Sequence, residues 1–259
     1  MRCADEIERV VQQEGSEYIS AFIAELILGT YPAGVTPPAD YYPRIREMCN
    51  KYNILTIADE VMTGFGWTGR NFGIEHWNVV PDIMSVGKGL SSGYTPIAVE
   101  EVYDAIYKES TSFVHGHTYG GNPLSCAVAL AVQNYIETQD LVSQCARIGE
   151  LMLDRLMPLQ ELPIAGEVRG KGLLIGTEFV ADREKKAPVD PLQGVTGMIV
   201  DSIFEKGVLV MPGAPGLIDS VAGVHIAISP PVTITETEAN QTVEAVRESI
   251  IEVSTRLGY

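Results

Sequence analysis

The chain has 259 residues, 46% of them hydrophobic, which is enough for one large or two ordinary globular domains. Its 18 basic and 34 acidic residues give a net charge of −16, and a field of that sign repels nucleic acid and anionic membranes. The four cysteines and four histidines show no C-x-x-C pair and no metal-ligand spacing. We therefore expect a cytoplasmic protein with no metal site and no nucleic-acid or membrane partner.

The first half of the chain alternates helical patterns with short apolar runs. The runs that predict strands are 18–27, 54–58, 83–86 and 97–99. The patterns that predict helices are 5–13, 37–52, a segment that begins at Glu100, 123–137 and 140–156. This alternation predicts an α/β fold with a mostly parallel sheet flanked by helices. Because the run 18–27 is apolar enough for a strand buried on both faces, we expect further strands of this sheet to be encoded upstream.

The pattern changes after Pro158. It predicts a strand at 168–180, a charged loop at 181–193, a helix, and short strands at 208–211 and 225–229. The last helix opens with a capping box, Thr235-x-x-Glu238. Its apolar stripe is Val243, Val246, Ile250, Val253 and Leu257. We expect a partial large domain over residues 1–155 and a smaller α+β domain over 156–259.

A literal G-x-G-x-x-G begins at Gly64, soon after the strand at 54–58. A dinucleotide fingerprint needs the strand to run directly into the first glycine and a helix to begin at the third. Here Asp59 and Glu60 intervene, and the sequence after Gly69 has weak helical periodicity. A tight loop is therefore favoured over a nucleotide site, and a nicotinamide oxidoreductase stays only as a minor alternative.

An acid and a lysine follow two neighbouring strands. Asp59 comes directly after the strand at 54–58, and Gly87-Lys88-Gly89 comes directly after the strand at 83–86. Either residue alone is more often an ordinary surface charge. Open α/β sheets bind ligands at the carboxyl ends of their strands, so the two together predict a site.

Seven ordered blocks carry a family resemblance. They are Ile57-Ala-Asp-Glu-Val61, Gly64-Phe-Gly-x-Thr-Gly69, Pro81-Asp-Ile83, Gly87-Lys-Gly-Leu90, His117-Thr-Tyr-Gly-Gly-Asn-Pro123, Val168-Arg-Gly-Lys-Gly-Leu-Leu-Ile-Gly176 and Ser229-Pro-Pro231. Together they resemble class III pyridoxal-phosphate (PLP) aminotransferases of fold type I, over essentially the whole chain. The family's long N-terminal stretch, with a phosphate-binding Gly/Ser loop and a stacking aromatic residue, has no counterpart here.

The resemblance implies roles for four residues. Lys88 matches the lysine that forms a Schiff base with the PLP aldehyde and then serves as general acid and base. Asp59 matches the acid that pairs with the pyridinium nitrogen, and Val61 matches a residue against one face of the ring. Thr118 matches the threonine that reaches the cofactor phosphate of a neighbouring subunit. A homodimer or higher oligomer with a shared active site is therefore implied.

Three departures from the family pattern bear on substrate and tuning. Met62 stands where the family often has glutamine, and Trp67 stands where it often has arginine. No arginine precedes Ser229-Pro-Pro to grip a substrate carboxylate. This favours an amine or ω-amino acid as amino donor and a 2-keto acid as acceptor.

The function expected from these residues is PLP-dependent transamination. An aminomutase, racemase or decarboxylase of the same fold would use the same lysine and acid. The non-enzyme alternative is a truncated, inactive chain or a partner subunit that contributes Thr118 across an interface.

Overall fold

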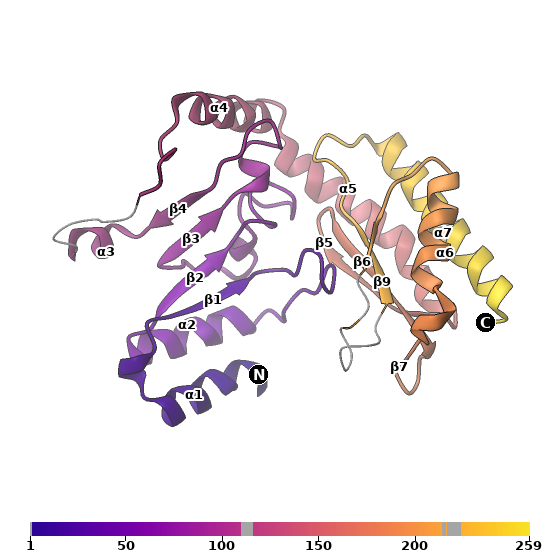
Figure 1. Cartoon of the computed structure of the whole chain (residues 1–259), viewed down its shortest axis with the longest axis horizontal. Coiled ribbons are helices and arrows are strands. Elements are labelled where there is room, and N and C mark those ends of the chain that lie inside the picture. Colours follow the sequence, from indigo (N-terminus) through magenta and orange to yellow (C-terminus); the bar gives the residue numbers. More distant parts are fainter. Residues whose placement is uncertain (1, 110–115, 214–215, 217–223) are drawn as a thin grey trace. The chain divides into compact units, whose positions relative to one another are not determined.

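The computed structural model describes residues 2–109, 116–213, 216 and 224–259 (Figure 1). The chain forms two compact units. The first comprises residues 1–26, 37–66 and 70–140, and the second comprises 27–36, 67–69 and 141–259. The helix at 141–156, which we assigned to the large domain, is thus part of the second unit. Among the described residues, no helix has the length and apolar character needed to cross a membrane.

The first unit is built on a four-stranded sheet in the order β1-β2-β3-β4. Strands β1 (Ala21–Glu25), β2 (Leu55–Asp59) and β3 (Ile83–Val86) are parallel, and β4 (Val99–Val102) is antiparallel to β3. The predicted α/β class with a mostly parallel sheet is confirmed.

Two predictions for this sheet are wrong in detail. The run 18–27 forms only the short strand β1, which is an edge of the described sheet, with Ile23 60% exposed. A helix was predicted from Glu100, but Glu100 and Glu101 belong to β4, and α3 (Asp104–Glu109) begins later. The backbone ladder with β3 decides this, because it pairs Val86 with Val99 and outweighs the helical propensity of two glutamates.

Two helices stack beside this sheet. Helix α2 (Tyr41–Tyr52) lies between α1 (Arg2–Glu14) and the strands, as Figure 1 shows. Buried residues of this layer are Ala4, Val11, Ile45, Cys49 and Ile54.

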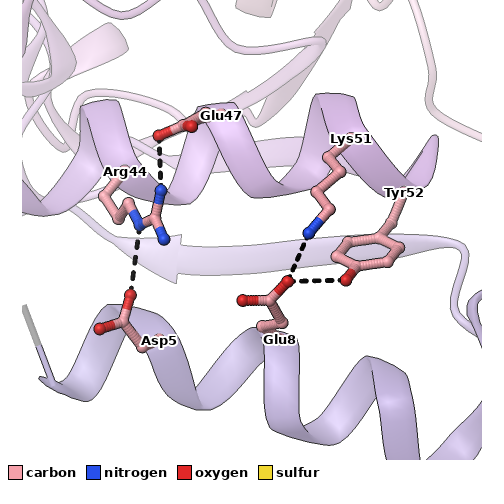
Figure 2. A network of polar contacts seen from close by, with 6 residues as sticks. All are labelled: Asp5, Glu8, Arg44, Glu47, Lys51 and Tyr52. Carbon is pink, nitrogen blue, oxygen red and sulfur yellow. Dashed lines mark hydrogen bonds and ion pairs between the residues drawn. The ribbon is translucent and has the colours of Figure 1, made fainter.

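The exposed side of the α1–α2 contact is charged (Figure 2). Arg44 donates from Nε to Asp5 Oδ1 at 3.2 Å, and Glu8 Oε1 accepts from Lys51 Nζ at 2.5 Å and from the Tyr52 hydroxyl at 2.7 Å. The hydrogen bond from Lys51, followed by that from Tyr52, lowers the pKa of the Glu8 carboxyl. These contacts hold the first helix in register on α2.

The second unit is an antiparallel sheet covered by helices. Its strand order is β5 (Ala165–Lys171), β6 (Leu174–Asp182), β9 (Val224–Ile228) and β8 (Met211–Pro212), and β7 (Ala187–Pro188) also pairs with β6. Its helices are α5 (Leu141–Leu156), α6 (Val195–Glu205) and α7 (Glu236–Leu257). The smaller α+β region expected in the C-terminal part is confirmed, and so is the capping box of α7, in which Thr235 Oγ1 accepts from Glu238 N at 3.3 Å.

The single strand predicted at 168–180 is instead a hairpin of β5 and β6. The turn is at Gly172, which has φ +57° and lies against the segment 67–69. A Cβ at Gly172 would come 2.4 Å from the Trp67 carbonyl oxygen, so only glycine fits there. The strand predicted at 168–180 runs through Gly170-Lys-Gly172, the turn signal that divides β5 from β6.

The contacts of segment 67–69 explain why a tryptophan can stand at position 67, where the family often has arginine. The Trp67 carbonyl accepts from Leu173 N at 2.8 Å, and the Trp67 side chain packs against the core of the second unit. The nearby segment 27–36 also belongs to this unit, because Arg169 Nε donates to Ala33 O at 3.1 Å. An indole suits this position because its contacts are mostly apolar.

Candidate functional site

The carboxyl ends of β2 and β3 bring the predicted acid and lysine to one edge of the first unit. Asp59 is the last residue of β2 and pairs in register with Ser85 of β3, three residues before Lys88. The Asp59 side chain is half-buried, and its Oδ1 accepts from Val61 N at 3.1 Å. That bond folds the chain back after the strand, as an Asx turn does.

Val61 and the glycine before the lysine lie close together. A Cβ at Gly87 would be 3.8 Å from Val61 Cγ1, which is ordinary van der Waals contact. Val61 therefore joins Asp59 and the Lys88 loop into one cluster. Thr118 lies in a turn ahead of α4 (Pro123–Thr138) and is exposed, and no described contact joins it to this cluster.

The lysine has an unusual backbone. Lys88 has φ +35°, in the left-handed region, which costs a non-glycine residue on the order of 1–3 kcal/mol. The loop closes through Leu90 N, which donates to Gly87 O at 2.8 Å, and Ser92 N, which donates to Lys88 O at 3.0 Å. Residues held in this way concentrate at functional sites.

The Lys88 side chain is exposed, and Nζ donates to Met62 Sδ at 2.7 Å. A thioether is a weak acceptor and carries no charge. Within the described part of the chain, the Lys88 amine makes no ion pair. The amine is thus accessible and close to Met62, the residue that replaces the family's usual glutamine.

Glu60 is a functional candidate that reasoning from the sequence passed over. It is completely buried and accepts hydrogen bonds from the Thr63 hydroxyl, from Gly73 N at 2.8 Å and from Ile74 N at 2.8 Å. Burial raises the pKa of its carboxyl, and these three donors oppose the increase. Glu60 thereby fixes the loop after β2 to the 3-10 helix Gly73–Trp77. The signal was its place directly after Asp59 in the resembling block.

The glycine loop has the shape of a bend. Gly64 N donates to Glu60 O at 2.9 Å, Phe65 has φ +62°, and no helix begins at Gly69. The geometry lacks the helix N-terminus that a dinucleotide pyrophosphate needs.

A second acid, the half-buried Asp82, sets the register of β2 and β3 from the opposite end. Asp82 accepts from Arg46 through both guanidinium nitrogens, from Thr56 N at 2.7 Å and from Thr56 Oγ1 at 2.9 Å. Partial burial acts to raise the pKa of Asp82, but the bonds from Arg46 and Thr56 outweigh it and lower the pKa. Since β2 and β3 carry Asp59 and the Lys88 loop, this cluster supports the site.

The fold is that of solved transaminases. One from the marine bacterium Virgibacillus superposes with a TM-score of 0.91 at 35% identity, covering 99% of this chain and 58% of its own. An amine transaminase from an uncultivated Pseudomonas species, solved with PLP bound, superposes with a TM-score of 0.88 at 37% identity, covering 97% and 56%.

The sequence matches the family described as Aminotransferase class-III over residues 1–250, and the chain belongs to this family. It is 41% identical over 259 residues to the uncharacterized aminotransferase YodT of Bacillus subtilis, covering 98% of this chain and 58% of the relative. It is 39% identical over 247 residues to gamma aminobutyrate transaminase 3, chloroplastic, of Solanum lycopersicum, covering 93% and 46%. The chain thus spans about half the length of the curated relatives it matches.

The family uses PLP, and the cluster at the sheet edge fits that cofactor. A primary amine at Lys88, a carboxylate at Asp59 and the apolar side chain of Val61 lie on adjoining segments at the ends of β2 and β3. These three groups suit the aldehyde, the pyridine nitrogen and the ring face of PLP, in that order.

Proposed function

We propose that this protein is a PLP-dependent transaminase that moves an amino group from an amine or ω-amino acid to a 2-keto acid. The observation that carries the proposal is the pairing of Asp59 with Ser85, which sets the acid beside the strand that ends at the Lys88 loop. An ordinary surface lysine would need neither a left-handed backbone nor flanking glycines.

Each residue of the cluster has a distinct task in this proposal. When bound, PLP supplies an electron sink for the carbanion formed at the substrate Cα. The Asp59 carboxylate holds the proton on the ring nitrogen, since an opposite charge at close range favours the protonated form. The Lys88 amine would hold the cofactor by its aldehyde carbon and would carry the proton at the substrate Cα. Val61 supports one face of the ring.

The proposed substrate class rests on the absence of an arginine that would bind a substrate carboxylate. The buried strand β9 and the Ser229-Pro-Pro segment after it contain no arginine, so a bidentate grip on an α-carboxylate is lacking there. An amine remote from any carboxylate needs no such grip. The names of two relatives, a gamma aminobutyrate transaminase and an amine transaminase, support the same class.

The assembly that we propose is a homodimer or higher oligomer in the cytoplasm, with Thr118 donating to a cofactor phosphate across the interface. Thr118 precedes Tyr119, which is 83% exposed, and Leu124 and Leu130 on α4 are 73% and 63% exposed. Apolar side chains of that size are often covered in an assembly. Light scattering of the purified chain checks the oligomeric state.

The function is tested by trapping the cofactor on the 259-residue chain. After incubation with PLP and reduction with borohydride, peptide mapping is expected to find the adduct on Lys88, and Lys88→Ala is expected to lose it. Lys171→Ala, which removes another exposed lysine, is the control and keeps the adduct. An adduct that persists in Lys88→Ala contradicts the assignment.

The alternatives give different results in the same preparation. A chain that takes up no PLP is inactive by itself. A racemase or decarboxylase binds PLP but does not convert it to the amine form when an amino donor is added, and a mutase that does so returns the amino group to the same carbon skeleton without a 2-keto acid. Transamination requires that conversion and its reversal by a 2-keto acid.

A further inference from the structure

One polar side chain of α4 holds the loop that carries Lys88. Gln133 lies in the second half of α4, and its Nε2 donates to Gly89 O at 3.2 Å and to Leu90 O at 2.9 Å. These carbonyls belong to the two residues directly after Lys88. The contact therefore acts on the backbone of the loop and does not involve the Lys88 side chain.

The chemistry of the contact requires an amide. Both acceptors are carbonyl oxygens, so only the NH₂ end of the Gln133 side chain can face them. The Gln133 side chain is half-buried, and burying part of an amide costs free energy unless it is hydrogen-bonded. A leucine or methionine would serve simple packing better, so the amide is explained by the loop.

A second contact ties the far end of the same loop to α4. Ser91 Oγ donates to Thr95 O at 2.6 Å, and Thr95 Oγ1 lies 2.9 Å from Ser125 Oγ on α4. Residues 87–95 are thus fastened to one helix at two points.

The loop needs this external support because its own conformation is unfavourable. Lys88 has φ +35°, Ser92 has φ +48° and Gly93 has φ +80°, and two of these three are not glycine. Such backbones persist where surrounding contacts over-determine them. Without the bonds from Gln133, the segment around Lys88 would depend on the loop's own backbone hydrogen bonds and on the contact of Thr95 with α4.

We propose that Gln133 is a positioning residue: its amide fixes the Lys88 loop, and thereby the Lys88 amine, at the carboxyl end of β3 beside Asp59. The effect on the amine rests on the proposed function, whereas the effect on the loop rests on the geometry alone. We call the two hydrogen bonds from Gln133 to Gly89 O and Leu90 O the Gln133 clamp. A reaction can slow roughly 100-fold when a reacting group is displaced by about 1 Å, so the clamp affects the rate even though Gln133 touches no substrate.

The sharpest test is Gln133→Glu, which is nearly isosteric and points a carboxylate at two carbonyl oxygens. Asn134→Asp is the matched control, because it makes the same amide-to-acid change one residue along at an exposed position of α4. Gln133→Met keeps the volume and removes the donors without adding charge, so it guards against misfolding of the glutamate variant.

Two measurements are made on the full chain. Hydrogen exchange reports the amides of Leu90, Ser91 and Ser92, which close the loop. We expect roughly tenfold faster exchange there in both Gln133 variants, as for the loss of about 1.4 kcal/mol of hydrogen bonding. The rate of borohydride trapping of PLP on Lys88 is expected to fall by roughly 10-fold to 100-fold. Asn134→Asp is expected to change neither.

The possible results distinguish the effect of Gln133 on the loop from the proposed PLP-dependent function. Unchanged loop exchange in both Gln133 variants overturns the clamp, and so does faster exchange spread over the whole first unit, which indicates a merely structural role. Faster loop exchange with unchanged trapping refutes the effect on the lysine. If the wild-type chain traps no PLP on Lys88, the proposed function fails, and loop exchange still tests the clamp by itself.

Discussion

Replacing Asp82 with asparagine tests how the sheet that carries the site is held in register. Asp82 accepts from Arg46 and from the backbone and hydroxyl of Thr56, and its side chain is 16% exposed. Asparagine keeps the size but offers one acceptor in place of two, and its NH₂ group then faces donors. Hydrogen bonds to a charged group contribute roughly 1.5–3 kcal/mol each. Allowing for the partly exposed Arg46, we expect Asp82→Asn to lower the free energy of unfolding of the first unit by about 2–4 kcal/mol at pH 7.

The pH dependence gives this prediction its sign. The folded-state pKa of Asp82 lies below its usual 3.8, so its stabilisation is fully present above pH 3.8 and is lost as the pH falls through the folded-state pKa. The difference between wild type and Asp82→Asn is therefore expected to be full at pH 7 and to shrink as the pH falls below 3.8, because the carboxyl of the unfolded chain takes up a proton before that of the folded chain.

The assay can follow the first unit alone. The chain has two tryptophans: Trp77 is buried in the first unit, and Trp67 lies in the second. In a Trp67→Phe background, urea unfolding followed by fluorescence reports Trp77. Asp104→Asn, at an exposed ion pair with Lys108, is the control and is expected to change stability by less than about 1 kcal/mol. An Asp82→Asn chain as stable as this control would refute the reasoning.

Two further predictions concern the second unit and the thiols. Trp67→Ala is expected to destabilise the second unit by about 2–4 kcal/mol, because it removes a partly buried aromatic side chain from the core, and calorimetry on Trp67→Ala and Trp67→Phe measures it. An effect as small as that of Trp67→Phe would contradict the packing. Burial raises the pKa of the Cys145 thiol to about 12, and burial also raises that of Cys49, so a thiol reagent at pH 8 is expected to modify only the exposed Cys3 and Cys126 until the chain unfolds. Rapid labelling of Cys145 in the native protein would show that its thiol is not enclosed.

Elements of the fold that depend on local sequence patterns were predictable, and elements that depend on pairing with distant strands were not. The strand at 83–86 and the helices at 123–137 and 140–156 were found within a residue or two, because periodicity and caps are local signals. The β5–β6 hairpin was missed because the predicted strand at 168–180 was carried through Gly170-Lys-Gly172, and only the pairing of β5 with β6 shows that the chain turns there. The strand predicted at 97–99 was placed too early, and β4 extends over Glu100 and Glu101 because these residues pair with β3.

The candidate site shows the same division. That Asp59 and Lys88 share a sheet edge followed from the sequence, because the carboxyl ends of parallel strands meet. The roles of Glu60, Asp82 and Gln133 did not follow, because all their partners except Thr63 lie 13 to 44 residues away in the chain.

The sequence by itself determined the class of the fold, the family and the acid and lysine at the strand ends, because these depend on periodicity and on short motifs. Only the tertiary structure decided that Trp67 serves the core of the second unit, that an amide of α4 holds the Lys88 loop, and that Met62 contacts the lysine. Contacts of this kind join distant segments, and a side chain's neighbours across space leave no local pattern in the chain.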